Sequence, residues 1–362
     1  MRLNTLALIA AGLFLLLALP CVAETPAPAD EIRKAAEQGN AGSQFDLGLM
    51  YNGGDGVTRD YAEAVKWFRK AAKQGHAGAQ GILGFAYGSG QGVTRDYAEA
   101  AKWLRKAAEQ GEAIGQYGLG GIYLDGQGLT RDDAEAVKWT RKAADQGFAP
   151  AQFNLGAMYR TGEGVTRDFT EAVKWTRKAA EQGHAAAQGS LGMMYRTGEG
   201  VTQDDAEAAK WFRNAAEQGI SVAQNTLGMI YHEGRGVTRD DVEAVKWMRK
   251  ASEQGFEAAQ FNLGLAYAKG QGVTRDYAEA AKWFHKPGHQ GHAAAQFYLG
   301  LMYRDGQGVA RNYALAYMWL SLAAAQNYEK ARETLDDLEK KVTPQQRDEA
   351  QRMAREWKPI HK

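Results

Sequence analysis

Three histidines close together in the sequence have the spacing nearest to that of a metal site: His285, His289 and His292. Imidazole is a frequent Zn²⁺ ligand, and histidines four residues apart can lie on one face of a helix. Pro287 and Gly288 separate the first two histidines, and both disfavour the helical register that would align the rings. His292 has repeat counterparts at His76 and His184, which indicates a structural role. We therefore predict no metal site and no bound cofactor.

The other residues that could do chemistry recur at regular intervals instead of clustering. Carboxylates such as Asp168 and Glu171 return in every segment, and no isolated nucleophile stands beside a base. Segments such as Gly162–Val165 suggest phosphate-binding loops, because a helix start follows them. No strand is expected before them, and their spacing fits neither nucleotide-binding motif. We therefore predict that the protein is not an enzyme.

A unit of 36 residues, seen most clearly from Ala149 to His184, is the source of this regularity. It occurs eight times in tandem over residues 41–328. The repeats begin at Ala41, Ala77, Ala113, Ala149, Ala185, Ser221, Glu257 and Ala293. A strict period of this length indicates a solenoid, in which each repeat buries its apolar face against its neighbours.

Each repeat predicts two short antiparallel helices. In the fourth repeat, helix A runs from Ala149 to Thr161, because apolar residues recur there at helical spacing. Two glycines then favour a turn with positive φ, and Asp168 is a suitable N-cap for the second helix, helix B. Gly183 stands where a left-handed C-terminal cap is expected.

Two further positions of the repeat indicate how the helices pack. Gly156 and its equivalents lie inside helix A, where glycine costs about 1 kcal/mol relative to alanine, so we expect close helix–helix approach there. Trp175 marks helix B and returns every 36 residues from Trp67 to Trp319. We expect Trp175 to be buried, and its truncation to alanine to cost about 3–5 kcal/mol.

The pattern Ala-x-Ala-Gln-x-x-Leu-Gly-x-x-Tyr-x-x-Gly-x-Gly-Val-x-x-Asp, followed by Ala, Trp and Ala-Ala-x-Gln-Gly, resembles the Sel1-like repeat (SLR). This family is related to the tetratricopeptide repeat (TPR), and the resemblance covers residues 41–328. It implies an α/α solenoid with a curved inner surface and an adaptor or scaffold role, without implying one reaction. We therefore predict an all-α, right-handed superhelical α/α solenoid of eight helix-turn-helix repeats.

Residues 1–23 have the features of a secretory signal peptide. Arg2 gives a basic start, Leu6–Leu19 is apolar but short for a membrane span, and small residues precede the expected cleavage point. We therefore predict a periplasmic or secreted protein without stable membrane insertion after cleavage. Lipid attachment at Cys21 is the alternative, although Pro20 departs from the small residue that usually precedes such a cysteine.

Charge and cysteine content exclude several classes of function. Cys21 is the only cysteine and would leave with the signal peptide, so the mature chain is predicted to lack disulfides and thiol chemistry. The chain has 44 basic and 43 acidic residues, and losing Arg2 makes the two numbers equal. A neutral chain offers no overall field for nucleic acid or anionic lipid. We therefore predict no nucleic-acid partner.

Both ends of the array carry predicted caps. Residues 24–40 combine a linker with an N-terminal half-repeat, and residues 329–362 contain two capping helices and a tail. Thr343–Gln346 is a capping box that opens the last helix. Helix B of the eighth repeat is apolar nearly all round, so it requires cover from this cap. In the seventh repeat, Pro287 predicts an early end or a kink of helix B.

The positions that vary inside helix A are the candidates for partner binding. If the repeats stack as in tetratricopeptide arrays, repeat positions 5, 9 and 12 line the concave groove, because their spacing puts them on one helical face. The candidate partner-binding residues are Phe45, Tyr117, Phe153, Arg160, Arg196, His232, Phe261, Phe297 and Arg304. Aromatic and arginine side chains are frequent interface anchors, and arginine pairs with carboxylates. We predict a non-enzymatic secreted scaffold or adaptor that binds a protein or peptide, with an acidic one favoured.

Two other interpretations remain open. The aromatic residues at position 5 could pack on a neighbouring helix while the arginines lie in solvent. The protein would then be a structural factor in cell-envelope assembly that uses its ends or its convex face. An aromatic groove is also compatible with a glycan or peptidoglycan ligand. Substitutions in the groove would abolish capture of a protein or a glycan, but not assembly through the ends.

Overall fold

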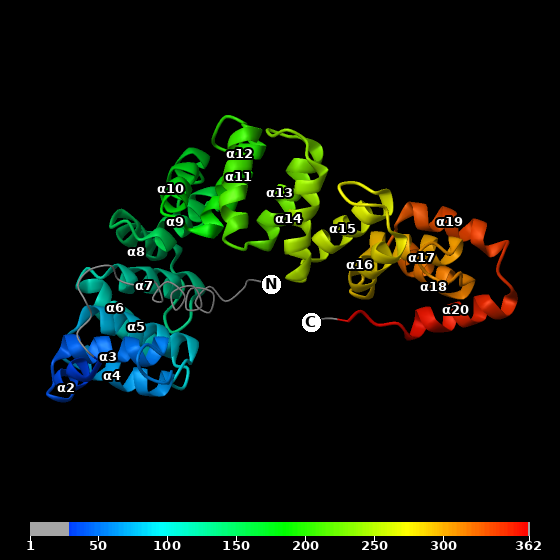
Figure 1. Cartoon of the computed structure of the whole chain (residues 1–362). Helices are drawn as coiled ribbons and strands as arrows, with labels where there is room; N and C mark the ends of the chain where they lie inside the picture. Colours follow the sequence, from blue (N-terminus) through cyan, green and yellow to red (C-terminus); the bar gives the residue numbers. More distant parts are fainter. Residues whose placement is uncertain (1–28, 361–362) are drawn as a thin grey trace. The chain divides into compact units, whose positions relative to one another are not determined.

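The structure is a computed structural model that describes residues 29–360. This range contains nineteen helices and no strand (Figure 1). The prediction of an all-α solenoid of helix-turn-helix repeats is confirmed. The predicted signal peptide, residues 1–23, lies outside the described residues. No helix in the described range has both the length and the apolar character needed to cross a membrane.

The helices alternate between the A and B types. The A helices are α3 (Ala41–Gly53), α5 (Ala77–Ser89), α7 (Ala113–Asp125), α9 (Ala149–Thr161), α11 (Ala185–Thr197), α13 (Ser221–Glu233), α15 (Glu257–Lys269) and α17 (Ala293–Asp305). The B helices are α4 (Tyr61–Lys73), α6 (Tyr97–Glu109), α8 (Asp133–Asp145), α10 (Phe169–Glu181), α12 (Asp205–Glu217), α14 (Asp241–Glu253), α16 (Tyr277–His289) and α18 (Tyr313–Ala325). The flanking helices are α2 (Ala29–Glu37), α19 (Glu329–Glu339) and α20 (Pro344–Glu356).

The chain folds as two compact units. The N-terminal unit contains the described residues up to Ala187 together with 199–201, and the C-terminal unit contains 188–198 and the residues from 202 onward. Within each unit, helix A packs on helix B of its own repeat, as α9 does on α10 and α13 does on α14. Helix B packs in turn on the next helix A, as α8 does on α9 and α14 does on α15. Contacts between sequence neighbours are what the strict period requires.

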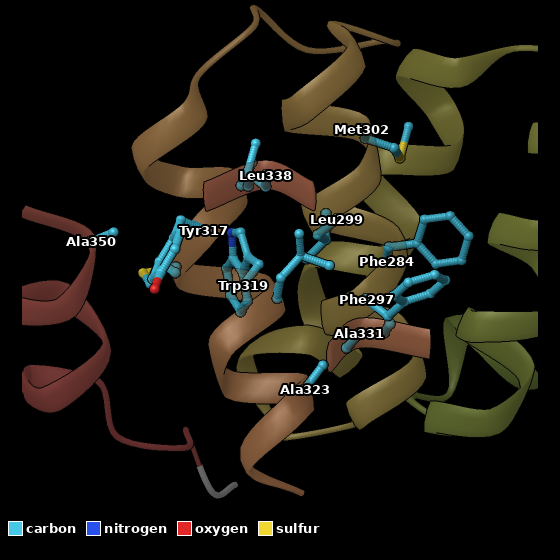
Figure 2. Close-up of a cluster of buried hydrophobic side chains, with 14 of the residues drawn as sticks. Phe284, Phe297, Leu299, Met302, Tyr317, Trp319, Ala323, Ala331, Leu338 and Ala350 are labelled. Carbon is cyan, nitrogen blue, oxygen red and sulfur yellow. The ribbon is translucent and has the colours of Figure 1, made fainter. Parts of the chain in front are cut away.

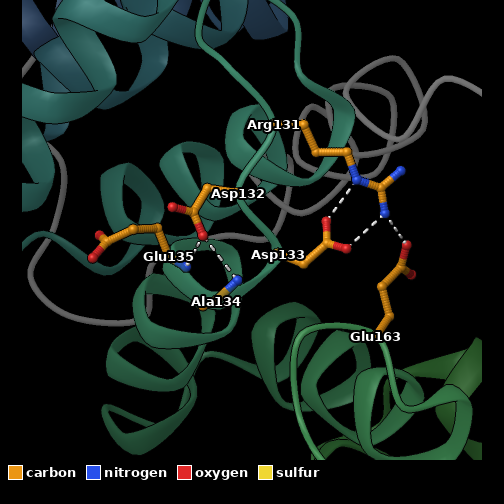
Figure 3. Close-up of polar contacts among 6 residues, drawn as sticks. All are labelled: Arg131, Asp132, Asp133, Ala134, Glu135 and Glu163. Atoms are coloured by element: carbon orange, nitrogen blue, oxygen red, sulfur yellow. Dashed lines mark hydrogen bonds and ion pairs between the residues drawn. The ribbon is translucent and has the colours of Figure 1, made fainter.

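The helix ends follow the local chemistry that the sequence predicts. Asp168 Oδ1 accepts hydrogen bonds from the backbone N–H groups of Thr170 and Glu171, at 2.9 and 3.0 Å. The same N-cap at Asp132 is drawn in Figure 3. Gly162 and Gly183 have φ of +81° and +85°, the left-handed conformation that glycine adopts at low cost. The predicted bounds of helix A in this repeat, Ala149–Thr161, are those of α9.

Glycine allows close approach at two places in the fourth repeat. A Cβ atom added at Gly156 would lie 2.5 Å from Thr176 Oγ1 and 3.0 Å from the backbone O of Ala172, both in helix B of the same repeat. A Cβ atom added at Gly164 would lie 2.1 Å from the backbone O of Asp133, in the preceding repeat. The expected close approach of the helices is therefore confirmed. The turn that resembled a phosphate-binding loop is packed against the start of the previous helix B.

Trp175 and a pair of glutamines hold neighbouring helices of the N-terminal unit together. Trp175 is 4% exposed, which confirms its burial, and its indole N–H donates to Glu171 Oε2 at 3.0 Å. Gln152 Nε2 donates to the backbone O of Ala144 at 3.1 Å, and Gln182 Nε2 donates to Gln152 Oε1 at 2.7 Å. Equivalent glutamine pairs recur along the array, for example Gln74–Gln44, Gln254–Gln224 and Gln326–Gln296. This chain of amides satisfies polar groups that the stacking buries.

Pro287 does not end helix B of the seventh repeat early, contrary to our expectation. Helix α16 runs through Pro287 to His289, so it keeps the length of the other B helices. Pro287 takes the buried position that Ala251 occupies in the sixth repeat. It lies in the last turn, where the missing N–H frees only one carbonyl of the helix. The closing bond is retained, because the N–H of His292 donates to the Pro287 carbonyl at 2.9 Å.

The ends of the array are capped as predicted. Helix α2 forms the N-terminal half-repeat, and its Ala36 carbonyl accepts from Gln44 Nε2 at 3.1 Å. At the other end, α19 and α20 both pack on the apolar helix α18. Ala331 and Leu338 of α19 and Ala350 of α20 belong to the same buried cluster as Tyr317 and Trp319 of α18 (Figure 2). The capping box at Thr343 and Gln346 starts α20, as expected.

Candidate functional site

The aromatic residues at repeat position 5 pack against the last residue of their own repeat. The ring of Phe45 stacks on His76 with centroids 4.5 Å apart, and Phe153 lies 5.1 Å from His184. In the C-terminal unit, the ring centroid of Phe261 lies 4.8 Å from that of His292. These three phenylalanine side chains remain half-buried, so part of each stays accessible.

Two other aromatic candidates are almost fully enclosed. Tyr117 is 5% exposed and its hydroxyl accepts from Asn154 Nδ2 at 3.1 Å. Burial raises the pKa of Tyr117 well above its usual range. Phe297 is 7% exposed and packs against Tyr298 and Tyr328. Both rings fill interior space, so ligand contact by Tyr117 and Phe297 stays a prediction that their burial disfavours.

The three arginines at position 12 have different surroundings. Arg160 is exposed and forms no ion pair with any residue in the range 29–360. Arg196 is half-buried, with its guanidinium carbon 6.0 Å from the centre of the Phe212 ring. Arg304 is occupied by a bidentate pair with Asp305, at 2.7 and 2.8 Å. Arg160 and Arg196 can therefore meet a partner carboxylate without first losing an ion pair, whereas Arg304 cannot.

His232, the remaining candidate, belongs to a charged group in the C-terminal unit. Its Nδ1 lies 2.6 Å from Asp241 Oδ1, and Arg239 donates to Asp241 Oδ2 at 2.7 Å. The hydrogen bond from Arg239 lowers the pKa of Asp241, and the contact with His232 adds to this effect. An aspartate at the same repeat position in the third repeat, Asp133, also pairs with its arginine.

That pair in the third repeat joins two turns of the N-terminal unit. Figure 3 shows Arg131 between Asp133 and Glu163, with distances of 2.6 Å to Asp133 Oδ1 and 2.8 Å to Glu163 Oε1. All three side chains are partly exposed, and solvent screening leaves such surface pairs with little effect on stability. The group links the two turns, and because one guanidinium is shared by two carboxylates it leaves no basic charge for an acidic ligand.

A cavity of about 110 Å³ lies beside His232, between α13, α14 and α15. Its apolar lining includes Val245, Met248 and Leu265, and Met229 stands at its edge with 37% of its surface exposed. Met229 and Leu265 occupy repeat position 9 in successive repeats. His232 and these two residues are thus brought together by adjacent A helices. The residues at repeat positions 5, 9 and 12 within a unit are called the helix-A surface below.

Sequence reasoning did not find Asp241 or the cavity. The signal for Asp241 is present, because an acidic residue replaces the aromatic residue that Tyr61, Tyr97 and Tyr277 supply at that repeat position. The cavity depends on side chains from three helices, and no single stretch of sequence contains them. The nine candidate residues divide between the units. Phe45, Tyr117, Phe153 and Arg160 lie in the N-terminal unit, and Arg196, His232, Phe261, Phe297 and Arg304 lie in the C-terminal unit.

The structure gives no sign of a metal centre among the residues that it describes. No group of three or more metal-ligating side chains occurs in the range 29–360. His292 lies against Phe261 and caps α17 through its Nδ1, so it does not join the other two histidines. His285 and His289 do lie together, with ring centroids 5.9 Å apart, because α16 keeps its helical register through Pro287.

The repeats match a known family over most of the chain. The sequence profile of the Sel1 repeat matches residues 41–76, 77–112, 113–148, 149–184, 185–220, 221–256, 257–292 and 293–328. The chain belongs to the Sel1 repeat family. Proteins of this family generally bind other proteins, and their TPR-like α/α solenoid is generally a non-catalytic scaffold. A comparison with curated proteins found no match.

Two solved structures resemble this Sel1 repeat protein along nearly their whole length. A Sel1 repeat protein from Oxalobacter formigenes is 36% identical, with 89% of this chain and 99% of that chain covered and a TM-score of 0.61. A protective antigen of uropathogenic Escherichia coli strains that displays an SLR fold is 31% identical. The match covers 91% of this chain and 94% of the antigen, with a TM-score of 0.53.

Proposed function

We propose that this protein is a secreted, non-enzymatic scaffold that binds a protein or peptide partner on its helix-A surface. The family supports the scaffold role, since Sel1 repeat proteins generally bind proteins. The N-terminal residues 1–23, with a basic start and a short apolar stretch, support export. The partner engages the accessible side chains of the A helices, while the B helices stabilise the array.

The observation that carries this proposal is the cavity beside Met229. An apolar side chain that is 37% exposed at the edge of a partly apolar cavity is the arrangement in which interfaces place an anchor residue. The two carboxylates of the lining, Glu233 and Asp241, are already paired with basic side chains. The cavity is small, so it accommodates one aliphatic side chain of a peptide rather than a whole ligand. Lys269 lies at its lining and forms no ion pair among the described residues. A hydrophobic residue next to an acidic one is the partner sequence that this pairing favours.

The test uses the mature chain, residues 24–362, to capture partners from an envelope extract, followed by mass spectrometry. Met229→Glu places a charge at the edge of the cavity, and we expect it to lose the captured protein. Val242→Glu is the matched control, because Val242 is 67% exposed at the start of α14 and lies outside the cavity lining. Equal capture by Met229→Glu and Val242→Glu would show that the partner does not bind at the cavity.

A second bait tests the arginines. Arg160, Arg196 and Arg304 are all changed to glutamate, and the matched control changes Arg95, Arg167 and Arg275 in the turns. Loss of the partner with the first bait alone supports an acidic ligand on the helix-A surface. Retention by both baits removes the arginines from the proposal and favours contact through the ends or the opposite face. If protease treatment leaves the captured material intact, the ligand is a glycan.

Export is tested separately from binding. The full chain is expressed with its natural N-terminus, and mass spectrometry determines the first residue of the protein in each cell fraction. We expect a mature protein that starts at Glu24 in the periplasm or medium. A chain that keeps residues 1–23 inside the cell contradicts export, and a lipid on Cys21 would establish the alternative anchor.

A further inference from the structure

The seventh repeat differs from the sixth at the end of helix B. Where α14 carries Arg249 and Glu253, α16 carries His285 and His289. Because each substitution keeps its place in the helix, the two imidazoles lie one turn apart on the same side of α16. All of these residues belong to the C-terminal unit. These two histidines are not part of the helix-A surface, so the partner-binding role does not account for them.

Neighbouring aromatic side chains hold the two imidazoles in place. The rings of His285 and His289 are nearly parallel, with an angle of 20° and centroids 5.9 Å apart. The edge of His289 faces Trp319 of α18, with ring centroids 5.0 Å apart. His285 Nε2 lies 3.4 Å from the hydroxyl of Tyr303 in α17. The pair is therefore pre-arranged by three helices of one compact unit.

A cavity of about 440 Å³ opens beside these rings. It is lined by Lys282, His285, Lys286, His289, Gln290 and Ile360. Its volume falls in the range of small-molecule sites, about 300–1,000 Å³. The C-terminal tail closes part of it, because the N–H of Ile360 donates to the His289 carbonyl at 3.0 Å. Gln290 Oε1 is buried there without a hydrogen-bond partner, unlike the glutamines that pair along the rest of the array.

Most of the surface that faces the cavity is apolar, and the ionisable side chains that line it are two lysines and two histidines, with no carboxylate among them. Lys282 pairs with Glu279 at 2.5 Å, so its charge is partly neutralised. Lys286 forms no ion pair among the described residues, and its side chain lines the cavity. Burial and the neighbouring His289 lower the pKa of His285. Tyr303 and Trp319, which face the imidazoles from α17 and α18, bring no compensating negative charge.

We propose that this cavity binds a small multivalent anion, whose carboxylate or phosphate oxygens accept hydrogen bonds from Lys286, His285 and His289. A bound anion favours the protonated form of the His285 imidazole, which burial otherwise disfavours. A metal ion fits this site poorly, because only two ligands converge and two ammonium groups line the same cavity. This anion site does not depend on the partner-binding role of the helix-A surface.

The test is isothermal titration calorimetry of the mature chain with two probes, inorganic pyrophosphate and citrate, at low ionic strength. We expect saturable binding that weakens by about tenfold or more from pH 5.5 to 7.5, because the His285 imidazole, whose pKa burial lowers, takes up a proton when the anion binds. Tighter binding of pyrophosphate identifies a phosphate ligand, and tighter binding of citrate identifies a carboxylate ligand. Absence of saturable binding of either probe at pH 5.5 overturns the proposal.

The two histidine variants copy residues of the sixth repeat, so that the fold is kept. His289→Glu introduces the residue found at 253 and should abolish binding by charge repulsion. Lys286→Gln should weaken binding about tenfold, the usual size of one charge-assisted contact, whereas Lys250→Gln at the equivalent place in α14 should leave it unchanged. His285→Arg should keep binding and reduce its pH dependence. Equal binding by the native chain and His289→Glu, or equal losses from the two lysine variants, contradicts the site.

Discussion

Helices α14 and α16 occupy the same place in successive repeats, but different side chains hold them. In the sixth repeat, the Arg249 guanidinium donates to the Tyr267 hydroxyl at 2.6 Å, and Gln254 Nε2 donates to Gln224 Oε1 at 2.7 Å. In the seventh repeat, a longer 3.4 Å contact between His285 and Tyr303 replaces the first bond. The second bond is missing there, because Gln260 Oε1 and Gln290 Oε1 are both buried without a partner.

The comparison shows that the backbone of a repeat tolerates the loss of several polar pairs. Both helices have thirteen residues and start at the same repeat position. What they share is the buried small-residue face, with Ala244 and Ala251 in α14 and Ala280 and Pro287 in α16. Helix packing along this face therefore sets the fold. The polar pairs add stability to each repeat. Where they are absent, the side chains at that surface are available to bind a ligand.

The tryptophans give the largest expected difference between the two helices. Trp247 is 4% exposed and its indole N–H donates to Glu243 Oε1 at 2.8 Å, whereas Trp283 is half-buried and its buried indole N–H has no partner. We expect Trp247→Ala to cost about 3–5 kcal/mol in the free energy of unfolding and Trp283→Ala to cost less. Urea unfolding followed by circular dichroism measures both. Equal losses in the free energy of unfolding would show that the two tryptophans contribute equally to the stability of their repeats.

Replacing the proline of α16 tests whether the lost backbone hydrogen bond makes the seventh repeat less stable than the sixth. Pro287→Ala restores the N–H that can donate to the Trp283 carbonyl, and we expect a gain of about 1 kcal/mol. Pro150→Ala is the control, since Pro150 lies in the first turn of α9, where no helical bond is lost. Thermal melting compares the two variants with the native chain. A lower melting temperature for Pro287→Ala would mean that packing of the proline ring contributes more stability than the restored hydrogen bond.

The glutamine pair gives a smaller and more specific difference. Gln254→Ala leaves the buried Gln224 Oε1 without its donor, so we expect a loss of about 1 kcal/mol. Gln290→Ala removes no hydrogen bond to Gln260, so its effect on the free energy of unfolding should be close to zero. Chemical unfolding of the two variants in parallel measures the contrast. A loss from Gln290→Ala as large as that from Gln254→Ala would show that the seventh repeat is paired in solution.

The smallest expected effect is a pH dependence of stability. Burial, and then the charge of His289, lower the pKa of His285 from 6.5 in the unfolded chain. The unfolded chain therefore binds the proton more readily, so stability is fully present above pH 6.5 and decreases as the pH falls through the folded pKa. We expect the double variant His285→Arg, His289→Glu to show a flatter melting temperature between pH 7.5 and 5.0. An unchanged slope would place the titration elsewhere, for example at His292, whose pKa is also lowered by burial.

Much of the fold was predictable because the same local sequence signals recur in all eight repeats. The bounds of α9 and the N-cap at Asp168 follow from residues within one repeat, and the structure has them where the sequence places them. The continuation of helix α16 through Pro287 was not predictable from helix propensity. It depends on the buried position that the ring fills and on the closing bond to His292, both of which are tertiary facts.

The candidate site was less predictable than the fold. Arg160 and Arg304 share one repeat position, but only Arg304 is neutralised, because Asp305 follows it where Thr161 follows Arg160. That difference is visible in the sequence once the geometry is known. The burial of Tyr117 is not, since Asn154 and the packing of the next repeat cause it. Sequence periodicity identifies a face of a helix, and only the neighbouring repeats decide which of its side chains remain accessible.

The most direct test of the account is hydrogen–deuterium exchange of the mature chain with and without the partner identified by capture. If the partner binds the helix-A surface, peptides from α13 and α15 should become protected. Peptides from α14 and α16 should then exchange as in the free protein. Protection confined to the B helices or to the capping helices α19 and α20, with α13 and α15 unchanged, would contradict binding on the helix-A surface.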